Sequence, residues 1–408
     1  MSSKTTDSSL EPSSDEKRII VVGAGVAGSH AALEAARNGA KVVLLEEHPQ
    51  VGVPSHCSGV VSLNGLAMLG VEPQSVFAQR TIQGAVFHPP KGEPLELRTK
   101  QPVAVIINRT RFDQYLAKNA VAGGVELHTK MRVSRFERYP DRTVGVSVQD
   151  GPTFKAGMMI DASGAGSRLP EQAGLSTPDW SQLLPGLQYE LGDIQKQGDM
   201  VELFFGSHRA PGFFAWSIPT GDHSARVGLA SRKGNVKKLL DDLVKEFWPK
   251  SAVEATKSGS VLVSGPIDKC WSENFLVVGD AASQVKQTTG GGIIIGGYSG
   301  ILAGRTAASA VKAPQEERWR FLMAYDREWR EKFGSDLRRM GIAHKLFAGL
   351  SDETLNRLFE GVREYLPEIQ EVADMDFQGK IISRMLRKKK FVGLLPRVAV
   401  DSIRAIFS

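Results

Sequence analysis

Three glycines near the start of the chain have the spacing of a phosphate-binding turn. Gly23, Gly25 and Gly28 follow a short apolar run, Arg18–Val22, and open a stretch with helical periodicity. In that setting the first glycine permits a tight turn, the second lets a pyrophosphate approach the backbone, and the third lets helix and strand pack closely. Glu46 ends the next strand pattern, where a carboxylate can accept hydrogen bonds from ribose hydroxyls. These residues predict a dinucleotide site with its pyrophosphate at a helix N-terminus.

A second glycine-rich segment lies late in the chain. The apolar run Phe275–Gly279 is followed by Asp280, and Thr288–Gly292 leads into Ile293 at the predicted start of a helix. Asp280 either accepts hydrogen bonds from ribityl hydroxyls or only caps the helix. The N-terminus of the following helix can stabilise negative charge on a reduced isoalloxazine ring. A nicotinamide dehydrogenase would need only the first motif, so the two segments together favour FAD, held at both ends.

The elements that must position these motifs indicate an α/β fold. Arg18–Leu45 has the pattern of a βαβ unit, Arg111–Ala122 that of a helix, and Met158–Ala162 that of a buried strand. From about residue 180 to 262, short alternating stretches predict an antiparallel sheet, with strands at Val201–Phe205, Phe213–Ile218 and Ala225–Ala230. We therefore predict a disordered tail at 1–17, a discontinuous Rossmann-like FAD-binding domain at 18–175 and 265–314, a β-rich substrate domain at 176–264, and a helical region at 315–408.

Composition sets further bounds. The 408 residues are 41% hydrophobic and 24% charged, which is ordinary for a soluble globular protein. The two cysteines, Cys57 and Cys270, make no disulfide framework and indicate a reducing, cytoplasmic environment. No Cys/His cluster has the spacing of metal ligands, so we predict no metal. Residues 290–311 form an apolar run of membrane-spanning length, but frequent glycine and the interrupting Arg305 favour a core helix against the cofactor.

At this point the chain resembles the geranylgeranyl reductase family of flavoproteins, within the larger group built like p-hydroxybenzoate hydroxylase. The resemblance covers most of residues 18–315, and archaeal members that saturate digeranylgeranylglycerophospholipids are the most similar in length and in their cysteine loop. Its most specific stretch is Ser283–Ile293. The other matching features follow in family order: the three-glycine motif, Glu46, the loop Gly52–Cys57, Arg109-x-x-Phe112-Asp113, and Gly279-Asp280-Ala-Ala.

The resemblance implies both a cofactor and a set of contacts. Arg109 is either a fixed cation near the diphosphate or a surface charge. The FAD contacts that the resemblance implies fall on Ala27, Glu46, Cys57, Ser58, Val60, Arg109, Val133, Asp280, Gly292 and Ile293. The chain departs from the family where an aromatic motif, Tyr-x-Trp-x-Phe-Pro, would bind substrate, since Phe214 replaces the tyrosine, Trp216 is kept, and Ile218 precedes Pro219.

Reduction of an isolated alkene needs a site that excludes water and supplies a proton. An apolar tunnel from the β-rich region would meet the first need, with Phe214, Trp216 and Pro219 as substrate-binding candidates. Phe204, Phe205 and Phe213 line the tunnel or only fill the sheet core. Cys57 with its neighbour His56 is the candidate catalytic pair for the proton, and a small buried hydrophobe is the alternative for Cys57.

The expected partners are a prenylated lipid and an external electron donor such as ferredoxin, a reduced deazaflavin or NAD(P)H, because no second dinucleotide motif is present. The C-terminus is basic, with apolar residues between the charges, which suits the surface of an anionic membrane or a solvated helical face. We therefore expect a cytoplasmic protein, peripheral at the inner face of the cell membrane, and no nucleic-acid binding. The basic residues are Lys380, Arg384, Arg387, Lys388, Lys389, Lys390, Arg397 and Arg404.

Three functions stay open on the sequence alone. The first is saturation of geranylgeranyl chains in membrane glycerophospholipids by FAD. Prenyl diphosphate, chlorophyll or quinone side chains are alternative substrates for the same chemistry. An FAD monooxygenase or halogenase shares the fold, and a flavin-bound carrier would hold prenyl lipids without reducing them.

Overall fold

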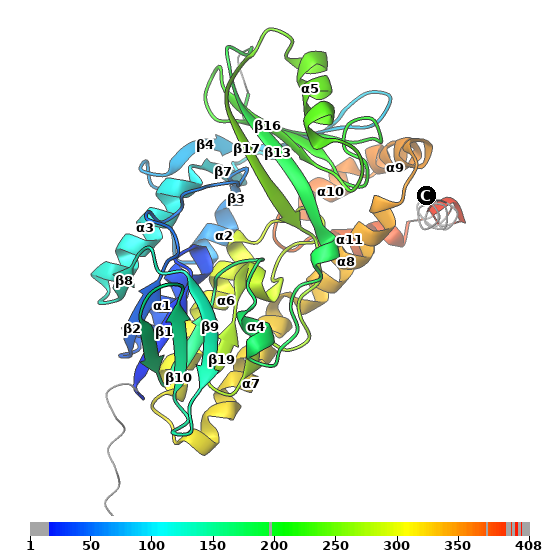
Figure 1. Ribbon diagram of the computed structural model, residues 1–408. Coiled ribbons are helices and arrows are strands. Elements are labelled where there is room, and N and C mark those ends of the chain that lie inside the picture. The colour runs from blue at the N-terminus through cyan, green and yellow to red at the C-terminus, as the bar shows by residue number, and fades with distance from the viewer. Residues whose placement is uncertain are drawn as a thin grey trace, which may run out of the picture.

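The computed structural model describes residues 16–195, 198–372, 374–388, 393, 396–398 and 401. The predicted tail lies outside these residues except for positions 16 and 17. A six-stranded sheet forms the base of the molecule (Figure 1). It is parallel apart from its edge strand β18 (Trp271–Ser272), and its four central strands are buried apolar runs, as expected where both faces are covered. In order across the sheet the strands are β18, β19 (Phe275–Val277), β12 (Met158–Asp161), β1 (Arg18–Val22), β2 (Lys41–Leu45) and β8 (Glu126–His128).

Two long helices pack against this sheet with their backbones in close approach. They are α1 (Val26–Arg37) and α6 (Ile293–Ala310). A methyl group at Gly300 would lie 2.2 Å from the carbonyl oxygen of Ala27, and one at Gly304 would lie 2.2 Å from that of Ala31. The regular glycine spacing of α6 therefore serves helix packing, as the core-helix prediction for 290–311 requires. Among the described residues, no helix combines the length and apolarity needed to span a bilayer.

Two small sheets and three further helices lie around the base sheet. An antiparallel three-stranded sheet adds Phe136, Val144 and Val146 to the same hydrophobic core as β1. A second three-stranded sheet lies between the base and the upper part of the molecule. These elements are β9 (Val133–Arg138), β10 (Val144–Val148) and β11 (Thr153–Ala156), then β3 (Val60–Ser62), β7 (Ala104–Ile107) and β4 (Ala78–Ile82), with helices α2 (Leu63–Met68), α3 (Arg109–Ala122) and α4 (Leu169–Gln172).

The upper part is a seven-stranded sheet with α5 (Val236–Phe247) on its outer face (Figure 1). Its strands are, in order, β17 (Ala252–Leu262), β13 (Leu183–Gly192), β16 (Ala225–Ala230), β15 (Ala215–Pro219), β14 (Met200–Phe204), β5 (Gly84–His88) and β6 (Leu95–Arg98). All pairs are antiparallel except β14 with β5. The last two strands come from residues that sequence analysis assigned to the FAD-binding domain, so the sheet draws on two distant parts of the chain.

Helices form the C-terminal region and lie along one side of both sheets (Figure 1). They are α7 (Arg318–Trp329), α8 (Ser335–Ala348), α9 (Asp352–Glu364), α10 (Leu366–Val372) and α11 (Gly379–Leu386), with one π-helical turn at Arg330–Gly334 joining α7 to α8. The predicted α/β class, with a second antiparallel sheet and a helical C-terminal region, is confirmed. The boundaries assigned to the domains stay predictions.

Candidate FAD and substrate site

A single cavity of about 1730 Å³ runs between the base sheet, the upper sheet and the C-terminal helices. Its wall includes the N-termini of α1 and α6, the loop Gly52–Gly59 in part, the inner face of the upper sheet and residues of α8 and α11. Every residue predicted to contact FAD or substrate lines this cavity except Gly28 and Pro219. Residues that are far apart in the sequence therefore meet around one space.

The first end of the cavity is built from backbone. A methyl group at Gly28 would lie 1.8 Å from the carbonyl oxygen of Gly23, and one at Gly23 would lie 2.4 Å from that of Ala162. These two glycines therefore hold the turn together, which explains why Gly28 is absent from the cavity wall. Gly25 is different, because a methyl group there would meet nothing within 4 Å. It caps α1 with no side-chain hydrogen bond, so the first N–H groups of that helix are left for a ligand.

Glu46 closes this end from the tip of β2. The residue is 7% exposed. One carboxylate oxygen accepts a hydrogen bond from the backbone N–H of Ala24 at 2.9 Å, and the other accepts from the backbone N–H of His48 at 3.0 Å. The His48 ring lies 2.8 Å from that second oxygen. The carboxylate is thus fixed in direction beside the glycine turn and keeps lone pairs for ribose hydroxyls.

Charged side chains occupy the middle of the cavity wall. Arg109 donates to Asp113 one turn later, with nitrogen–oxygen distances of 3.2 and 3.0 Å. Burial acts to lower the pKa of Arg109, but the nearby Asp113 carboxylate and Cys57 sulfur act to raise it, and the net change is upward. Arg109 is therefore a fixed cation in the cavity wall and not a free surface charge, and its contact with the FAD diphosphate stays a prediction.

Asp280 lies across the cavity, after β19. It is accessible there, yet surrounding protein raises the pKa of its carboxyl through desolvation, while Arg109 acts in the opposite direction. Among the described residues, none donates a hydrogen bond to its carboxylate. A methyl group at Gly292 would lie 2.6 Å from Asp280 Oδ1, so glycine at 292 lets this carboxylate sit against the start of α6. Asp280 does not cap α6 by a side-chain hydrogen bond, which favours the ligand interpretation over the cap.

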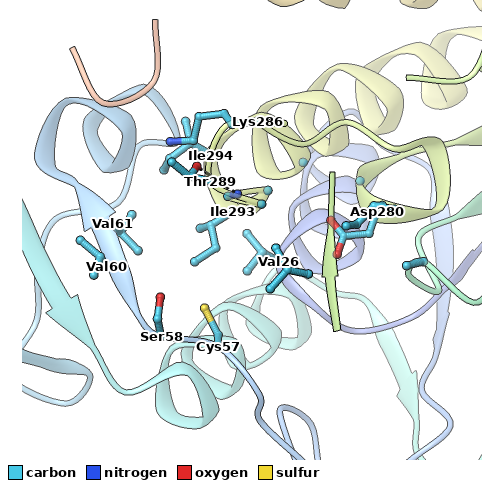
Figure 2. A pocket seen from close by; sticks show the side chains of 18 of the residues that line it. Val26, Cys57, Ser58, Val60, Val61, Asp280, Lys286, Thr289, Ile293 and Ile294 are labelled. Carbon is cyan, nitrogen blue, oxygen red and sulfur yellow. Dashed lines mark hydrogen bonds between the residues drawn. The ribbon is translucent and has the colours of Figure 1, made fainter. Parts of the chain in front are cut away.

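The start of α6 and the cysteine loop face each other across the same space. Figure 2 shows Cys57 and Ser58 on one side and Ile293 with Thr289 on the other, with Asp280 further along. The Cys57 sulfur accepts a hydrogen bond from the backbone N–H of Gly59 at 3.3 Å. His56 is exposed, and no hydrogen bond joins its ring to Cys57 among the described residues. The structure thus brings both candidates to the cavity without linking them.

These features fit FAD as the occupant. Two helix N-termini without side-chain caps open onto one cavity, which suits a pyrophosphate at one end and an anionic ring system at the other. The carboxylates of Glu46 and Asp280 border the space between them and accept hydroxyl donors. The open position at Gly25 leaves room for a ligand at the α1 turn.

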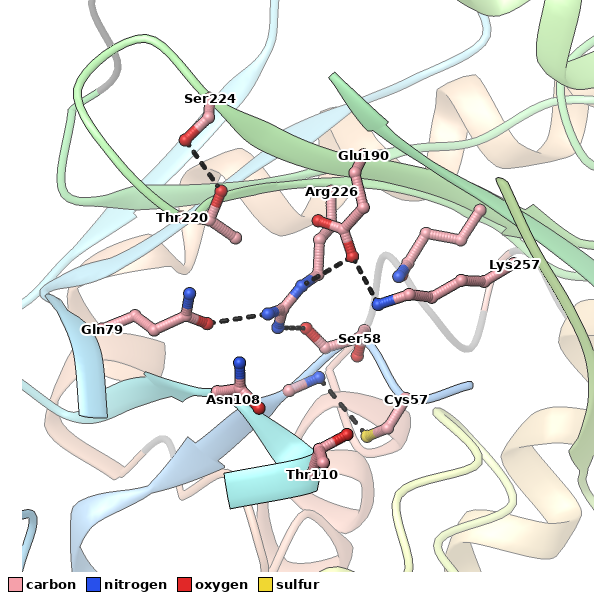
Figure 3. A network of polar contacts seen from close by, with 12 residues as sticks. Cys57, Ser58, Gln79, Asn108, Thr110, Glu190, Thr220, Ser224, Arg226 and Lys257 are labelled. Carbon is pink, nitrogen blue, oxygen red and sulfur yellow. Dashed lines mark hydrogen bonds and ion pairs between the residues drawn. The ribbon is translucent and has the colours of Figure 1, made fainter. Parts of the chain in front are cut away.

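A polar network from the upper sheet fixes the cysteine loop (Figure 3). Arg226 of β16 is 6% exposed. Its guanidinium donates to the carbonyl oxygens of Ser58 at 2.8 Å and Ile107 at 3.0 Å, and to Gln79 Oε1 at 2.7 Å.

Two further charges from neighbouring strands complete this network. Arg226 Nε lies 3.3 Å from Glu190 of β13, which also accepts from Lys257 of β17 at 2.8 Å. The guanidinium fills the space next to Gly59, where a methyl group would lie 2.4 Å from it. One buried cation thus ties the upper sheet to the loop that carries Cys57.

Aromatic side chains line the cavity beneath the upper sheet. Phe213 and Phe214 stack with ring centroids 4.2 Å apart, and Phe214 meets Trp216 edge-on at 6.2 Å. Trp216 is held by a hydrogen bond from its Nε1 to Gln188 Oε1 at 3.1 Å. Phe205 also lines the cavity. This part of the wall has the apolar character that the tunnel prediction requires.

Two further residues do not line the cavity: Phe204, for which the sheet core was the alternative interpretation, and Pro219, which was predicted to bind substrate. Phe204 is fully buried against α5, in the core on the outer face of the sheet. Pro219 is buried at the end of β15, beyond the cavity wall. Residues along a strand point alternately to its two faces, so Trp216 and Ile218 face the cavity and Pro219 points to the opposite face.

The C-terminal region closes the cavity through a buried ion pair. Lys286, in the loop before α6, donates to Asp376 Oδ1 and to the carbonyl oxygen of Met375, both at 2.8 Å. Ser62 donates to the other Asp376 oxygen. Thr288 in the same loop donates to Gln378 Oε1 at 2.6 Å. Lys286 and Asp376 are 9% and 2% exposed.

Sequence reasoning missed these contacts. Arg226 stands alone among apolar residues in β16, and Lys286 stands between a buried strand and a buried helix. A charge in such surroundings needs a partner, and that signal was present in the sequence. The identity of the partner was not, since Glu190 and Asp376 are placed by strand pairing and by C-terminal packing. The residues of α10 and α11 that line the cavity, Ile369, Ile381, Ile382 and Met385, were also not predicted as site residues.

Known proteins share this arrangement. Two family models match, one for an FAD dependent oxidoreductase at residues 18–177 and one for a geranylgeranyl reductase catalytic domain at residues 183–265. Digeranylgeranylglycerophospholipid reductase 2 of Methanothermobacter thermautotrophicus is 33% identical over 84% of this chain and 91% of its own length. The digeranylgeranylglycerophospholipid reductase of Methanothrix thermoacetophila is 32% identical over 89% and 94%.

Solved structures show the same fold. A geranylgeranyl bacteriochlorophyll reductase-like protein from Thermoplasma acidophilum aligns with a TM-score of 0.82 at 24% identity, over 93% of this chain and 98% of that one. A flavin-dependent halogenase aligns with a TM-score of 0.68 at 17% identity, over 93% and 78%. The glycine turn, the late Asp280 and α6 segment, and the extent of these matches agree: the chain belongs to the geranylgeranyl reductase family of FAD-dependent oxidoreductases.

Proposed function

We propose that this enzyme saturates C=C bonds of geranylgeranyl chains in archaeal-type membrane glycerophospholipids. The observation that supports this most is the single cavity that joins an FAD-type cradle to an aromatic and aliphatic wall. The substrates named for the relatives are geranylgeranyl lipids, and a long apolar chain suits this wall. Bound in reduced form, FAD supplies the hydride for one alkene carbon. The protein must exclude water, position the alkene and supply a proton for the other carbon.

The residues of the chain have three tasks in this proposal. Phe213, Phe214 and Trp216 exclude water and hold the alkene in place, since apolar contacts are the main handle on a hydrocarbon. Arg226 fixes the Cys57–Gly59 backbone at one wall. A proton must reach the second alkene carbon, and the Cys57 sulfur at the cavity wall is the candidate donor, with His56 beside it as the group that would return the proton.

Substitution of Cys57 tests the proton-donor role. The Cys57→Ser variant should retain bound FAD, since serine is close to cysteine in size and the other predicted FAD contacts are unchanged, and it should lose turnover by roughly a hundredfold, the usual contribution of a positioned acid. Flavin absorbance and single-turnover oxidation by substrate measure the two properties separately. The His56→Gln variant serves as the partner test. Full turnover with bound FAD in Cys57→Ser would remove this residue from the mechanism.

The reductant and the cellular location complete the proposal. We propose an external donor such as ferredoxin, a reduced deazaflavin or NAD(P)H, on the ground that the described fold has one dinucleotide turn. We also propose peripheral contact with the inner face of the membrane through the basic C-terminus. Of its charged residues, Lys389, Lys390 and Arg404 lie outside the described residues.

Lipid mass spectrometry tests the reaction. Purified enzyme, reduced with dithionite so that the natural donor is not needed, is incubated with detergent-dispersed unsaturated archaeal phospholipid. The expected result is a mass gain of two hydrogens for each double bond reduced. The same assay with geranylgeranyl diphosphate, a prenylated quinone and a prenylated chlorophyll ranks the alternative substrates. A reducible flavin with no mass gain in any lipid would contradict the proposal and favour a carrier.

A monooxygenase or halogenase activity is the other class that the fold allows. It predicts oxygen-dependent product formation or NADPH-driven peroxide release, with no saturation of the alkene. Running the lipid assay with and without oxygen separates the two classes, because alkene reduction proceeds without oxygen.

A further inference from the structure

Helices α8 and α11 lie side by side and form one wall of the cavity (Figure 1). Their junction is fixed, because the backbone N–H of Gly379 at the start of α11 donates to buried Asp336 of α8 at 2.6 Å. On the inner side, Ile381, Ile382 and Met385 of α11 line the cavity. Phe347 of α8 does the same. The apolar faces of both helices are therefore turned to the proposed lipid site.

The outer side of the same two helices is basic and hollowed. A second cavity, of about 410 Å³, is bordered by one residue of α8 and five residues at and after α11. These are Arg339, Lys380, Ser383, Arg384, Arg387 and Lys388. Five cations and one hydroxyl converge there, and none of the carboxylates that the structure describes borders the space. Phosphate oxygens are the ligands that such a donor set suits.

Most of these cations have no acidic partner among the described residues. Lys388 pairs with Glu368 at 2.8 Å, whereas Arg339, Lys380, Arg384 and Arg387 make no ion pair or hydrogen bond through their side chains to the residues that the structure describes. Four cations without an ion pair to the described residues therefore gather around one hollow, where α11 separates it from the apolar cavity.

An exposed apolar side chain lies on the same face. Ile342 of α8 is 53% exposed, one turn after Arg339, and exposed Lys345 and Arg338 flank it. A hydrophobic residue surrounded by cations is the pattern of a surface that rests in the headgroup region of an anionic bilayer. An acidic protein partner would account for the charges but not for the apolar cavity directly behind them.

We infer that the outer face of α8 and α11 docks on an anionic bilayer, with a lipid phosphate in the hollow between Arg339 and Arg384. This inference deepens the proposed function, because it places the lipid source next to the helix whose other face lines the lipid cavity. It adds α8 to the membrane contact, which sequence analysis limited to the C-terminal stretch. The binding partner inferred for this surface is the anionic headgroups of a lipid bilayer.

Vesicle binding tests the inference. Full-length enzyme is mixed with vesicles of phosphatidylcholine, either alone or with one third phosphatidylglycerol, and bound protein is separated by flotation. Wild-type enzyme should bind the anionic vesicles and release them as salt is raised. The Arg339→Glu/Arg384→Glu double variant should bind them at least about tenfold more weakly, because each cation near an anionic surface contributes to the attraction. The Ile342→Ser variant should bind anionic vesicles more weakly than the wild type, and the difference should be largest at high salt, where the charges are screened.

A matched control reverses two cations on another face that make no ion pair with the described residues. Arg111 and Lys118 are exposed on α3, so the Arg111→Glu/Lys118→Glu variant changes net charge equally and should keep most of the binding. Equal loss in both double variants, or equal binding of wild type to neutral vesicles, would overturn the inference. Displacement from vesicles by inorganic phosphate at constant ionic strength would also overturn it, because the hollow would then be a free-phosphate site.

The test separates this inference from the proposed function. Reduction of detergent-dispersed lipid does not need docking, so the Arg339→Glu/Arg384→Glu variant should reduce it at the wild-type rate. Normal vesicle binding with no lipid reduction would contradict the proposed function alone. If the double variant binds vesicles normally but no longer oxidises an acidic redox protein, the face belongs to a protein partner and the inference fails.

Discussion

The two ends of the large cavity are made in different ways. At the dinucleotide end, the wall is mainly backbone: Gly23, Gly25 and Gly28 shape a turn at the start of α1, and Glu46 is fixed by two backbone N–H groups. At the substrate end, the wall is made of side chains from the upper sheet, the cysteine loop and the C-terminal helices. Long-range contacts such as that of Arg226 with Ser58 hold these segments together.

The two ends of the cavity should therefore differ in how well they tolerate substitutions. Gly23 and Gly28 tolerate no added side-chain atom, because no rotation of a side chain can relieve a clash with a carbonyl oxygen. A side-chain site can be altered one residue at a time, and its shape then follows the substrate. The first end is therefore suited to one invariant cofactor and the second to a variable lipid.

The largest effect should come from filling the turn. The Gly28→Val variant should give no folded protein with bound flavin, since even a methyl group at this position would lie 1.8 Å from the Gly23 carbonyl oxygen. Flavin absorbance after purification and thermal unfolding measure the result. Gly25→Ala is the matched control, because its methyl group meets no protein atom within 4 Å. It should fold normally and bind FAD more weakly, and a folded, flavin-loaded Gly28→Val would break the comparison.

Removing the buried cation of the substrate end should have the next largest effect. The Arg226→Ala variant should lose roughly 2–4 kcal/mol of unfolding free energy, because it leaves the carbonyl oxygens of Ser58 and Ile107 without their buried donor, while Glu190 keeps Lys257 as its partner. Urea unfolding measures this. Flavin should stay bound in the folded fraction while lipid turnover falls.

Two further variants sharpen this test. Arg226→Lys keeps the charge but cannot reach both carbonyls, so it should restore stability only in part. The Arg135→Ala variant, which removes an exposed partner of Glu137, should unfold like the wild type. Loss of flavin from folded Arg226→Ala would show that the two ends are not separable.

A smaller loss of unfolding free energy should appear at acid pH. Each end of the cavity has a buried histidine, so both ends should contribute to this loss. His30 of α1 and His344 of α8 are buried, and desolvation lowers the pKa of each from 6.5 to about 4. As the pH falls below 6.5 the unfolded chain gains these protons first, so stability present at neutral pH is lost progressively down to pH 4. Each histidine should account for about 2 kcal/mol of the loss at pH 5.

Unfolding at pH 7.5 and pH 5 measures this loss. The His344→Gln and His30→Gln variants should each lose less stability than the wild type over that interval. His344 accepts a hydrogen bond from Arg232 at 3.0 Å, and glutamine can also accept it, so the neutral-pH stability should change little. If His30→Gln loses as much unfolding free energy as the wild type between pH 7.5 and pH 5, while His344→Gln loses less, then only the histidine at the substrate end contributes to the pH dependence.

The same contrast explains what sequence could predict. Gly23, Gly28 and the late Asp280–Gly292 segment act through local geometry, so spacing alone identified them and the strands beside them. Pairing between distant segments has no such local signature. The addition of β5 to the upper sheet depends on its parallel register with β14, and the role of Arg226 depends on where β16 meets the cysteine loop. Pro219 shows the reverse case, a motif residue that strand geometry keeps out of the cavity.

The ion pair between Lys286 and Asp376 makes the C-terminal segment and the loop before α6 a single thermodynamic unit. Whatever detaches residues 374–378 also removes the partners of Lys286 and Thr288, and so loosens the loop that precedes the second helix N-terminus. By linkage the reverse holds, and a ligand that orders this loop stabilises the C-terminal segment by the same free energy. Bound flavin should therefore protect the C-terminal segment against proteolysis, and proteolytic loss of that segment should be felt as weaker retention of flavin.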